Sequence, residues 1–215
     1  MGSITRSFAN NITTSGVLLP ASLTNASIAN VTAYNASVAT GGMVLVSSAT
    51  ASASANIEFS LGSYKEYQFF FIDIHASVDG ASLNFNFSTD NGSNYNVTKT
   101  STYFSAYHFE NDLGHDLPYR PDQDLAQGTG FQNLTKNLGN DNDENASAIL
   151  NIFNPSSTTY VKHFLGTTSD TNKDIAILNN FVAGYANTTS ALTNIKFQMD
   201  TGNIDDGTIL MYGIV

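Results

Sequence analysis

Short apolar runs separated by Asn, Gly, Asp, Ser and Thr fill most of the chain from residue 43 onward. The segment Leu83-Asn-Phe-Asn-Phe87 alternates strictly, which predicts a strand with Leu83, Phe85 and Phe87 on its buried face and Asn84 and Asn86 outside. Similar segments recur about every 8–15 residues, a spacing typical of sandwiches and barrels. They are residues 43–47, 53–59, 64–75, 83–87, 95–108, 148–153, 159–167, 175–186, 195–199 and 208–214. With almost no helical periodicity, the pattern predicts an all-β fold, an antiparallel β-sandwich of jelly-roll type with an extended N-terminal arm.

Two parts of the chain depart from the strand pattern. Residues 1–42 are small, polar and aperiodic, and their scattered apolar side chains are too few to form a core, so we expect an anchoring or interface arm there and a β-sandwich domain in residues 43–215. The arm residues expected to make contacts are Ile4, Phe8, Ile12, Leu18 and Leu19. Residues 110–145 are rich in Gly, Asp, Asn and Pro, which predicts a short helix or an ordered loop with a functional or interface role.

Composition narrows the classes of partner. The chain has 215 residues, a formal net charge of −10 and only 12% charged residues, while Ser, Thr and Asn make up about a third of it. No nucleic-acid partner is expected, because binding a phosphate backbone requires clustered Lys and Arg. The absence of cysteine excludes disulfides and Cys-based metal sites. No run approaches the roughly 18 apolar residues of a membrane span, and the start lacks an apolar signal core, so we expect synthesis in a cytoplasm without membrane insertion.

Candidate catalytic residues are few. The four histidines lack a short metal-binding spacing, and none lies beside a Gly-x-Ser-x-Gly elbow. Asp122 and Asp124 could pair with Glu110 as glycosidase acid and base, but carboxylates are informative only once their separation is known. We therefore interpret the chain as non-enzymatic and expect no cofactor, apart from a calcium ion considered next.

The acidic segment from Asp141 to Asn145 alternates carboxylates with amides, as the first half of a calcium loop does. Asp141, Asp143 and Asn145 are the predicted Ca²⁺ ligands. Ala146 stands where an EF-hand requires glycine, and the distal glutamate is missing, so a solvated turn stays open as the alternative.

Three tyrosines are candidates for contact with a host surface. Tyr103, Tyr107 and Tyr119 lie in or near the irregular segment, and exposed tyrosines can stack on sugars or on a protein partner. Because strand alternation buries many aromatic residues, placement in the core stays open for each of them.

Several stretches carry a resemblance to a known family. They are Ile4-Thr-Arg-Ser-Phe-Ala-Asn-Asn-Ile12, Ser88-Thr-Asp-Asn-Gly-Ser-Asn-Tyr-Asn-Val-Thr98, Phe153-Asn-Pro-Ser-Ser-Thr-Thr-Tyr-Val161, Phe181-Val-Ala-Gly-Tyr185, Gly202-Asn-Ile-Asp-Asp-Gly-Thr-Ile209 and Met211-Tyr-Gly213. Through them the chain resembles virion structural proteins, fibre-like or decoration, of tailed bacteriophages of marine bacteria. The resemblance implies a non-enzymatic subunit on the virion exterior, either a capsid decoration or cement protein or a head or tail fibre. It also implies other virion proteins as partners and a homotrimer, and it supplies no catalytic residues.

A second function stays open beside the structural one. The chain could be the receptor- or glycan-binding module of a tail fibre, with residues 110–145 and the nearby tyrosines contacting a polysaccharide of the host surface. The residues themselves do not distinguish a head location from a tail location.

Overall fold

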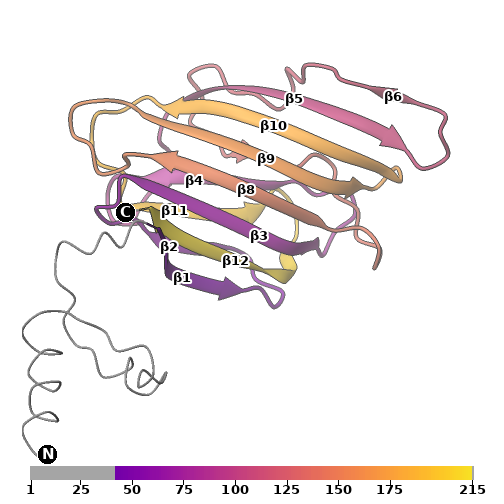
Figure 1. Cartoon of the computed structure of the whole chain (residues 1–215), viewed down its shortest axis with the longest axis horizontal. Coiled ribbons are helices and arrows are strands. Elements are labelled where there is room, and N and C mark those ends of the chain that lie inside the picture. The colour runs from indigo at the N-terminus through magenta and orange to yellow at the C-terminus, as the bar shows by residue number, and fades with distance from the viewer. Residues whose placement is uncertain (1–41, 215) are drawn as a thin grey trace, which may run out of the picture. The chain divides into compact units, whose positions relative to one another are not determined.

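The computed structural model describes residues 42–214, which form two antiparallel β-sheets packed together (Figure 1). No helix occurs among these residues, so the predicted all-β sandwich is confirmed. The predicted arm, including its five proposed contact residues, lies outside the described residues except for Gly42.

The large sheet has eight strands and the small sheet has four. In spatial order the large sheet contains β1 (Met43–Thr50), β12 (Ile204–Ile214), β3 (Glu66–Ala76), β8 (Ala146–Phe153), β9 (Lys162–Asn172), β10 (Ala176–Ala186), β5 (Lys99–Phe109) and β6 (His115–Asp116). The small sheet contains β2 (Ile57–Ser60), β11 (Asn194–Met199), β4 (Leu83–Ser88) and β7 (Gln132–Asn133). Figure 1 shows β6 at one end of the large sheet and β1 at the other.

The strand order is that of a jelly roll with two insertions. The strands β1-β12-β3-β8 form one half of the jelly roll, and β2-β11-β4-β7 form the other. Consecutive jelly-roll strands along the chain alternate between the two sheets, from β1 to β4, then from β7 to β8 and from β11 to β12. β5 and β6 are inserted before β7, and the β9–β10 hairpin is inserted before β11. The predicted jelly roll is therefore confirmed. Because all four inserted strands join the large sheet, it extends well beyond its partner.

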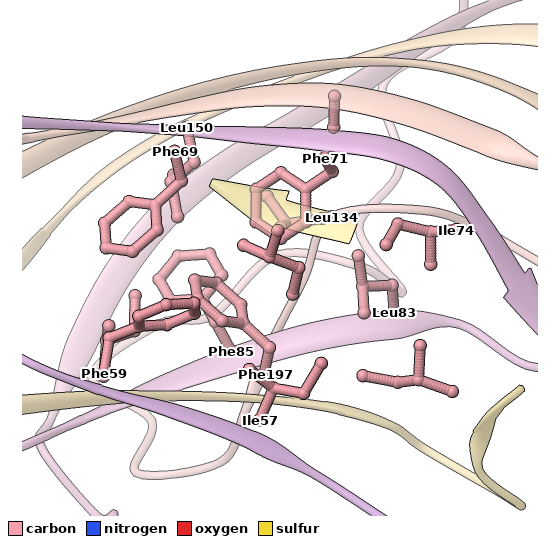
Figure 2. Packing of buried hydrophobic residues seen from close by; sticks show 14 of the residues in the cluster. Ile57, Phe59, Phe69, Phe71, Ile74, Leu83, Phe85, Leu134, Leu150 and Phe197 are labelled. Atoms are coloured by element: carbon pink, nitrogen blue, oxygen red, sulfur yellow. The ribbon is translucent and has the colours of Figure 1, made fainter. Parts of the chain in front are cut away.

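An aromatic cluster fills the space between the sheets (Figure 2). Phe197 of β11 is fully buried at the centre of this cluster. Its ring centroid lies 5.0 Å from that of Phe71, 5.3 Å from that of Phe69 and 6.2 Å from that of Phe59. All three pairs meet edge to face, a geometry that stabilises by about 0.5–1.5 kcal/mol per pair beyond burial. One side chain of the small sheet thus contacts strands of both sheets.

The alternating segment of β4 behaves as predicted on one face only. Its three apolar residues lie in the core, whereas Asn84 and Asn86 point the other way and are nevertheless buried. Asn86 donates from Nδ2 to the carbonyl oxygens of Tyr95 at 2.7 Å and Thr129 at 2.9 Å, and it accepts from Nζ of Lys99. Alternation identified the face correctly, but these loop segments cover that face and remove it from solvent.

The irregular segment 110–145 is an ordered loop without a helix. It pairs along the edge of β5, where Tyr107 and His108 face the two residues of β6 and Phe104 bridges to Tyr119. Farther on, Leu134 reaches the core from beneath the large sheet. The loop therefore caps one end of the sandwich on the side where the small sheet is too narrow to do so.

Candidate interaction face

Side chains that point away from the small sheet form the outer face of the large sheet. Strand periodicity places every second residue on this face, and the ladder aligns Phe104 of β5 directly with Phe181 of β10. The apolar residues of this outer face come from every strand of the large sheet except β6 and include Met43, Leu45, Phe70, Ile72, Phe104, Ile149, Phe153, Leu165, Ile177, Phe181, Leu210 and Tyr212.

Much of this apolar surface is open to solvent. Leu45 and Leu165 are each 52% exposed and Ile177 is 46% exposed. The rings of Phe104 and Phe181 stack with centroids 4.9 Å apart and planes 13° from parallel. Exposed apolar surface that continues across many strands marks a site of protein or ligand contact, because monomeric proteins rarely expose such large patches.

The outer face carries hydroxyls and amides but almost no charge. Charged residues on this side of the described strands occur only near the strand ends, as at Glu66 of β3, which accepts a 2.7 Å hydrogen bond from Nδ2 of Asn151. A shallow groove of about 330 Å³ crosses the middle of the face, with Ile72 and Ile149 beside Thr167 and Asn179. The net charge of the chain is −10, so most of its acidic groups must lie away from the outer face.

The small sheet presents a different outer surface. Nζ of Lys196 lies 2.8 Å from Oε1 of Glu58 and 4.3 Å from the ring centre of Tyr95, and the Tyr95 hydroxyl donates to Glu58 Oε2 at 2.8 Å. Polar and charged groups that satisfy one another are typical of a solvated surface. The two sides of the sandwich therefore differ in chemistry.

Strand β1 adds an exposed apolar edge to the outer face. Its run Met43-Val-Leu-Val46 is exposed on both sides, with Val44 and Val46 each at 41%. β1 pairs with β12 and is the end strand of the large sheet among the described residues. Unpaired apolar edges favour association with another chain, so the edge and the outer face both indicate contact with a partner.

The three candidate host-contact tyrosines lie in different surroundings. The prediction for Tyr103 is wrong, because its side chain is fully buried and its hydroxyl donates to the Leu134 carbonyl at 3.1 Å. Tyr119 is 51% exposed and its hydroxyl donates to the Asp124 carboxylate. Tyr107 is half-buried, with the guanidinium of Arg120 5.6 Å from its ring centre. Only Tyr107 and Tyr119 are therefore placed to contact a ligand.

Tyr107 and Arg120 line a cavity of about 300 Å³, which we call the Arg120 cavity. It lies on the inner side of β5, β9 and β10, under the loop 110–145 and away from the outer face. Its other walls include Phe109, Lys136 and Asn172. The cavity was not apparent from the sequence, because Arg120 and Lys136 lie in an irregular loop and most of the other walls come from three separate strands.

The predicted calcium loop is a closed turn. Glu144 is buried, its backbone N–H donates to the Asp141 carbonyl at 2.9 Å, and its carboxylate accepts from the Asp141 N–H at 3.0 Å. Asp141, Asp143 and Asn145 are exposed. In residues 42–214, no group of three His, Cys, Asp or Glu side chains is placed to hold a metal ion, and a Ca²⁺ site here stays a prediction.

Two of the three possible glycosidase carboxylates, Asp122 and Asp124, are engaged with other groups, and the third, Glu110, is exposed. Asp122 pairs with Nζ of Lys136, and hydrogen bonds from Lys136 and Gln123 lower the Asp122 pKa to about 2. Asp124 accepts from Tyr119. A general acid near neutral pH requires a raised pKa, so the Asp122 environment does not suit that role.

Comparisons with protein families, with curated proteins and with solved structures find no match to this chain. Within the part of the chain that the structure describes, no helix is long and apolar enough to cross a membrane. The outer face and the Arg120 cavity are therefore the features of this chain that bear on its function.

Proposed function

We propose that the protein is a non-enzymatic structural subunit on the exterior of a bacteriophage virion, and that its outer face is buried against a second copy of the same chain. The observation that carries this proposal is the exposed, apolar and almost uncharged outer face. In such a subunit the arm, residues 1–42, would attach the domain to the particle or to a sister subunit.

The size of the outer face suits a stable interface. Six neighbouring strands, from β12 to β5, have 8 to 11 residues each. At about 4.8 Å between strands and 3.3 Å per residue, they span roughly 900 Å². Specific interfaces bury about 800 Å² per partner, so one face of this size is sufficient. Apolar sheet faces also pack well on one another, at about 10 Å between layers.

Charge favours a second copy as the occupant. Two copies with net charge −10 repel each other wherever their acidic surfaces meet. Contact through a face with charge only near its strand ends avoids that repulsion and also avoids desolvating ions. A basic partner would instead be attracted to the acidic surfaces, and the outer face offers it no complementary groups.

The virion assignment has separate support. Several stretches across the chain resemble virion proteins of marine tailed phages, and jelly rolls are common in viral capsid and lectin domains. A fold alone does not determine function, so this support is weaker than that from the outer face.

The oligomeric state of the full-length chain tests the contact between copies. Phe181→Asp places a carboxylate in the middle of the outer face, where burial against a second copy would cost several kcal/mol. Leu113→Asp is the matched control, because Leu113 is 86% exposed on the loop 110–145. Light scattering after size-exclusion chromatography should show one homo-oligomer for the wild type and for Leu113→Asp, and a folded monomer for Phe181→Asp.

Two results of that experiment would overturn the contact. One is a wild-type protein that stays monomeric at high concentration, as expected if residues 1–41 or another virion protein covers the face. The other is a Phe181→Asp oligomer of unchanged mass. Circular dichroism of each variant separates loss of association from loss of folding.

Cryo-electron microscopy of purified virions tests the structural role. The chain should be traceable in density on the capsid lattice or on the tail, in several copies related by symmetry. Virions that lack the chain would refute a structural role even if the purified protein forms an oligomer.

A further inference from the structure

The Arg120 cavity is a second feature with a definite chemistry, separate from the outer face. The ladder places Leu178 of β10 opposite Tyr107 of β5 on one side and Asp170 of β9 on the other, all on the inner side of the sheet. Leu178 and Tyr107 line the cavity, and Arg120 and Lys136 close it from the loop 110–145. The volume of about 300 Å³ is at the lower end for small-molecule sites, enough for a ligand about the size of a monosaccharide.

Arg120 is the cation in this cavity that has no acidic partner. It is the only arginine in residues 42–214, a region that contains all 18 acidic residues of the chain. Its Nε donates to Oγ of Ser105 at 3.0 Å, and its guanidinium lies over the ring of Tyr107. Among the described residues no carboxylate lies within ion-pair distance of it. A half-buried guanidinium with unused N–H groups is suited to binding an anion through two parallel hydrogen bonds.

The balance of charge favours a carboxylate over a phosphate. The second cation of the cavity, Lys136, is already paired with Asp122. Asp174 also lies at the wall, and its Oδ1 is 4.0 Å from Nζ of Lys173. With Asp122 and Asp174 each beside a lysine, the cavity offers about one uncompensated positive charge, that of Arg120, which matches a carboxylate. A phosphate monoester carries nearly two negative charges near neutral pH. Asp174 at the wall would repel the excess charge.

The rest of the wall favours a hydroxylated ring as the body of the ligand. Tyr107 and Phe109 supply aromatic surface for the C–H face of a sugar. Asn137 and Asn172 supply amides that can both donate to and accept from hydroxyl groups. A simple carboxylate would contact Arg120 alone, and the aromatic rings and amides would remain hydrated.

We propose that the Arg120 cavity binds a hexuronic acid unit of an acidic polysaccharide. The carboxylate contacts Arg120, the ring packs on Tyr107, and the hydroxyl groups contact Asn137 and Asn172. This inference deepens the alternative function, recognition of a host-surface polysaccharide, and it does not depend on the outer face being an interface. Screening by salt reduces the repulsion between the acidic ligand and the net charge of −10, while a pair inside the cavity is screened much less.

Isothermal titration of the full-length chain with an oligogalacturonate tests the proposal. The comparison ligands are a neutral oligosaccharide of the same length, acetate and inorganic phosphate. Arg120→Gln removes the charge, and Lys65→Gln is the matched control, because Lys65 is exposed and lies outside the cavity. We expect the wild type and Lys65→Gln to bind the uronate equally and Arg120→Gln to bind it at least about tenfold more weakly.

Further variants keep the test decisive if Arg120→Gln fails to fold. Arg120→Lys keeps the charge but loses the planar fork, and Tyr107→Leu removes the stacking ring, so both should weaken uronate binding. Absence of uronate binding by the folded wild type would overturn the proposal, as would unchanged binding by folded Arg120 variants. Acetate or phosphate binding as strong as the uronate would refute a saccharide ligand. Phe181→Asp should bind the uronate normally, which separates failure of this site from failure of the interface.

Discussion

Asp170 gives the sharpest test of how the inner side of the large sheet is built. Asp170 lies on β9 between β8 and β10 and is only 1% exposed, and its Oδ1 accepts hydrogen bonds from Thr168 at 2.6 Å and from Asn180 at 2.7 Å. Oδ2 has no partner of ordinary geometry among the described residues. Burial outweighs the hydrogen bonds to Asp170, which lower its pKa, and raises the Asp170 pKa from 3.8 to about 7.

This raised pKa links folding to protonation with a definite sign. The folded protein holds the Asp170 proton more tightly than the unfolded chain does, so the stabilisation is complete below pH 3.8 and is lost as pH rises through about 7. The pKa of Asp170 in the folded protein and that in the unfolded chain differ by about three. Each pKa unit corresponds to about 1.4 kcal/mol, so the change in the free energy of unfolding is at most ~4 kcal/mol. Asp170→Asn keeps a neutral side chain at every pH and should remove this dependence.

Urea unfolding followed by circular dichroism, at one protein concentration between pH 4 and 8, measures the effect. The free energy of unfolding of the wild type, relative to Asp170→Asn, should fall by up to ~4 kcal/mol across this range. Asp90 and Asp122 do not interfere, because hydrogen bonds hold their pKa values near 2. Asp143→Asn, at an exposed turn, controls for loss of a negative charge. A difference between wild type and Asp170→Asn that stays constant with pH would refute the reasoning.

Three further substitutions test other parts of the fold. Burial lowers the pKa of Lys99 from 10.5 to about 7, so wild-type stability should fall as pH drops from about 10 to 7, and Lys99→Met should abolish that slope in urea titrations. Phe197→Ala should cost about 3–5 kcal/mol, because it empties the centre of the aromatic cluster, and a loss below about 1 kcal/mol would contradict the packing. Gly184→Val should lower the melting temperature strongly, since a Cβ there would lie 2.5 Å from the Phe164 ring and from the Thr100 carbonyl; an unchanged melting temperature would show that the strands can separate.

The alternation of apolar and polar residues was sufficient to predict the class of fold and most of its strands. Period-two patterns and turn residues are local properties, and β4 and β10 occur within a few residues of their predicted bounds. The strand predicted from residue 159 begins later, at Lys162, because the N–H groups of Thr159 and Tyr160 donate to Oγ of Ser157, at 3.2 and 3.1 Å, rather than to a neighbouring strand. Local chemistry decided that boundary, although the pattern of apolar residues did not reveal it.

Alternation alone could not assign the faces of the large sheet. It separates Tyr103 from Phe104, but both faces of β5 carry aromatic residues, so only the position of the small sheet shows that Tyr103 is inside. The same limit made Tyr103 a wrong candidate for host contact.

Composition and periodicity predicted an acidic, cysteine-free, all-β chain and the approximate positions of its strands, because both are local properties of the chain. Which strands are neighbours became visible only in the folded chain. Pairing of β1, β12, β3, β8, β9, β10 and β5 gathers apolar side chains from distant segments into one outer face, and the loop 110–145 brings Arg120 over Tyr107. Both candidate sites depend on contacts between residues far apart in the chain, where burial and strand pairing, rather than local pattern, set the geometry.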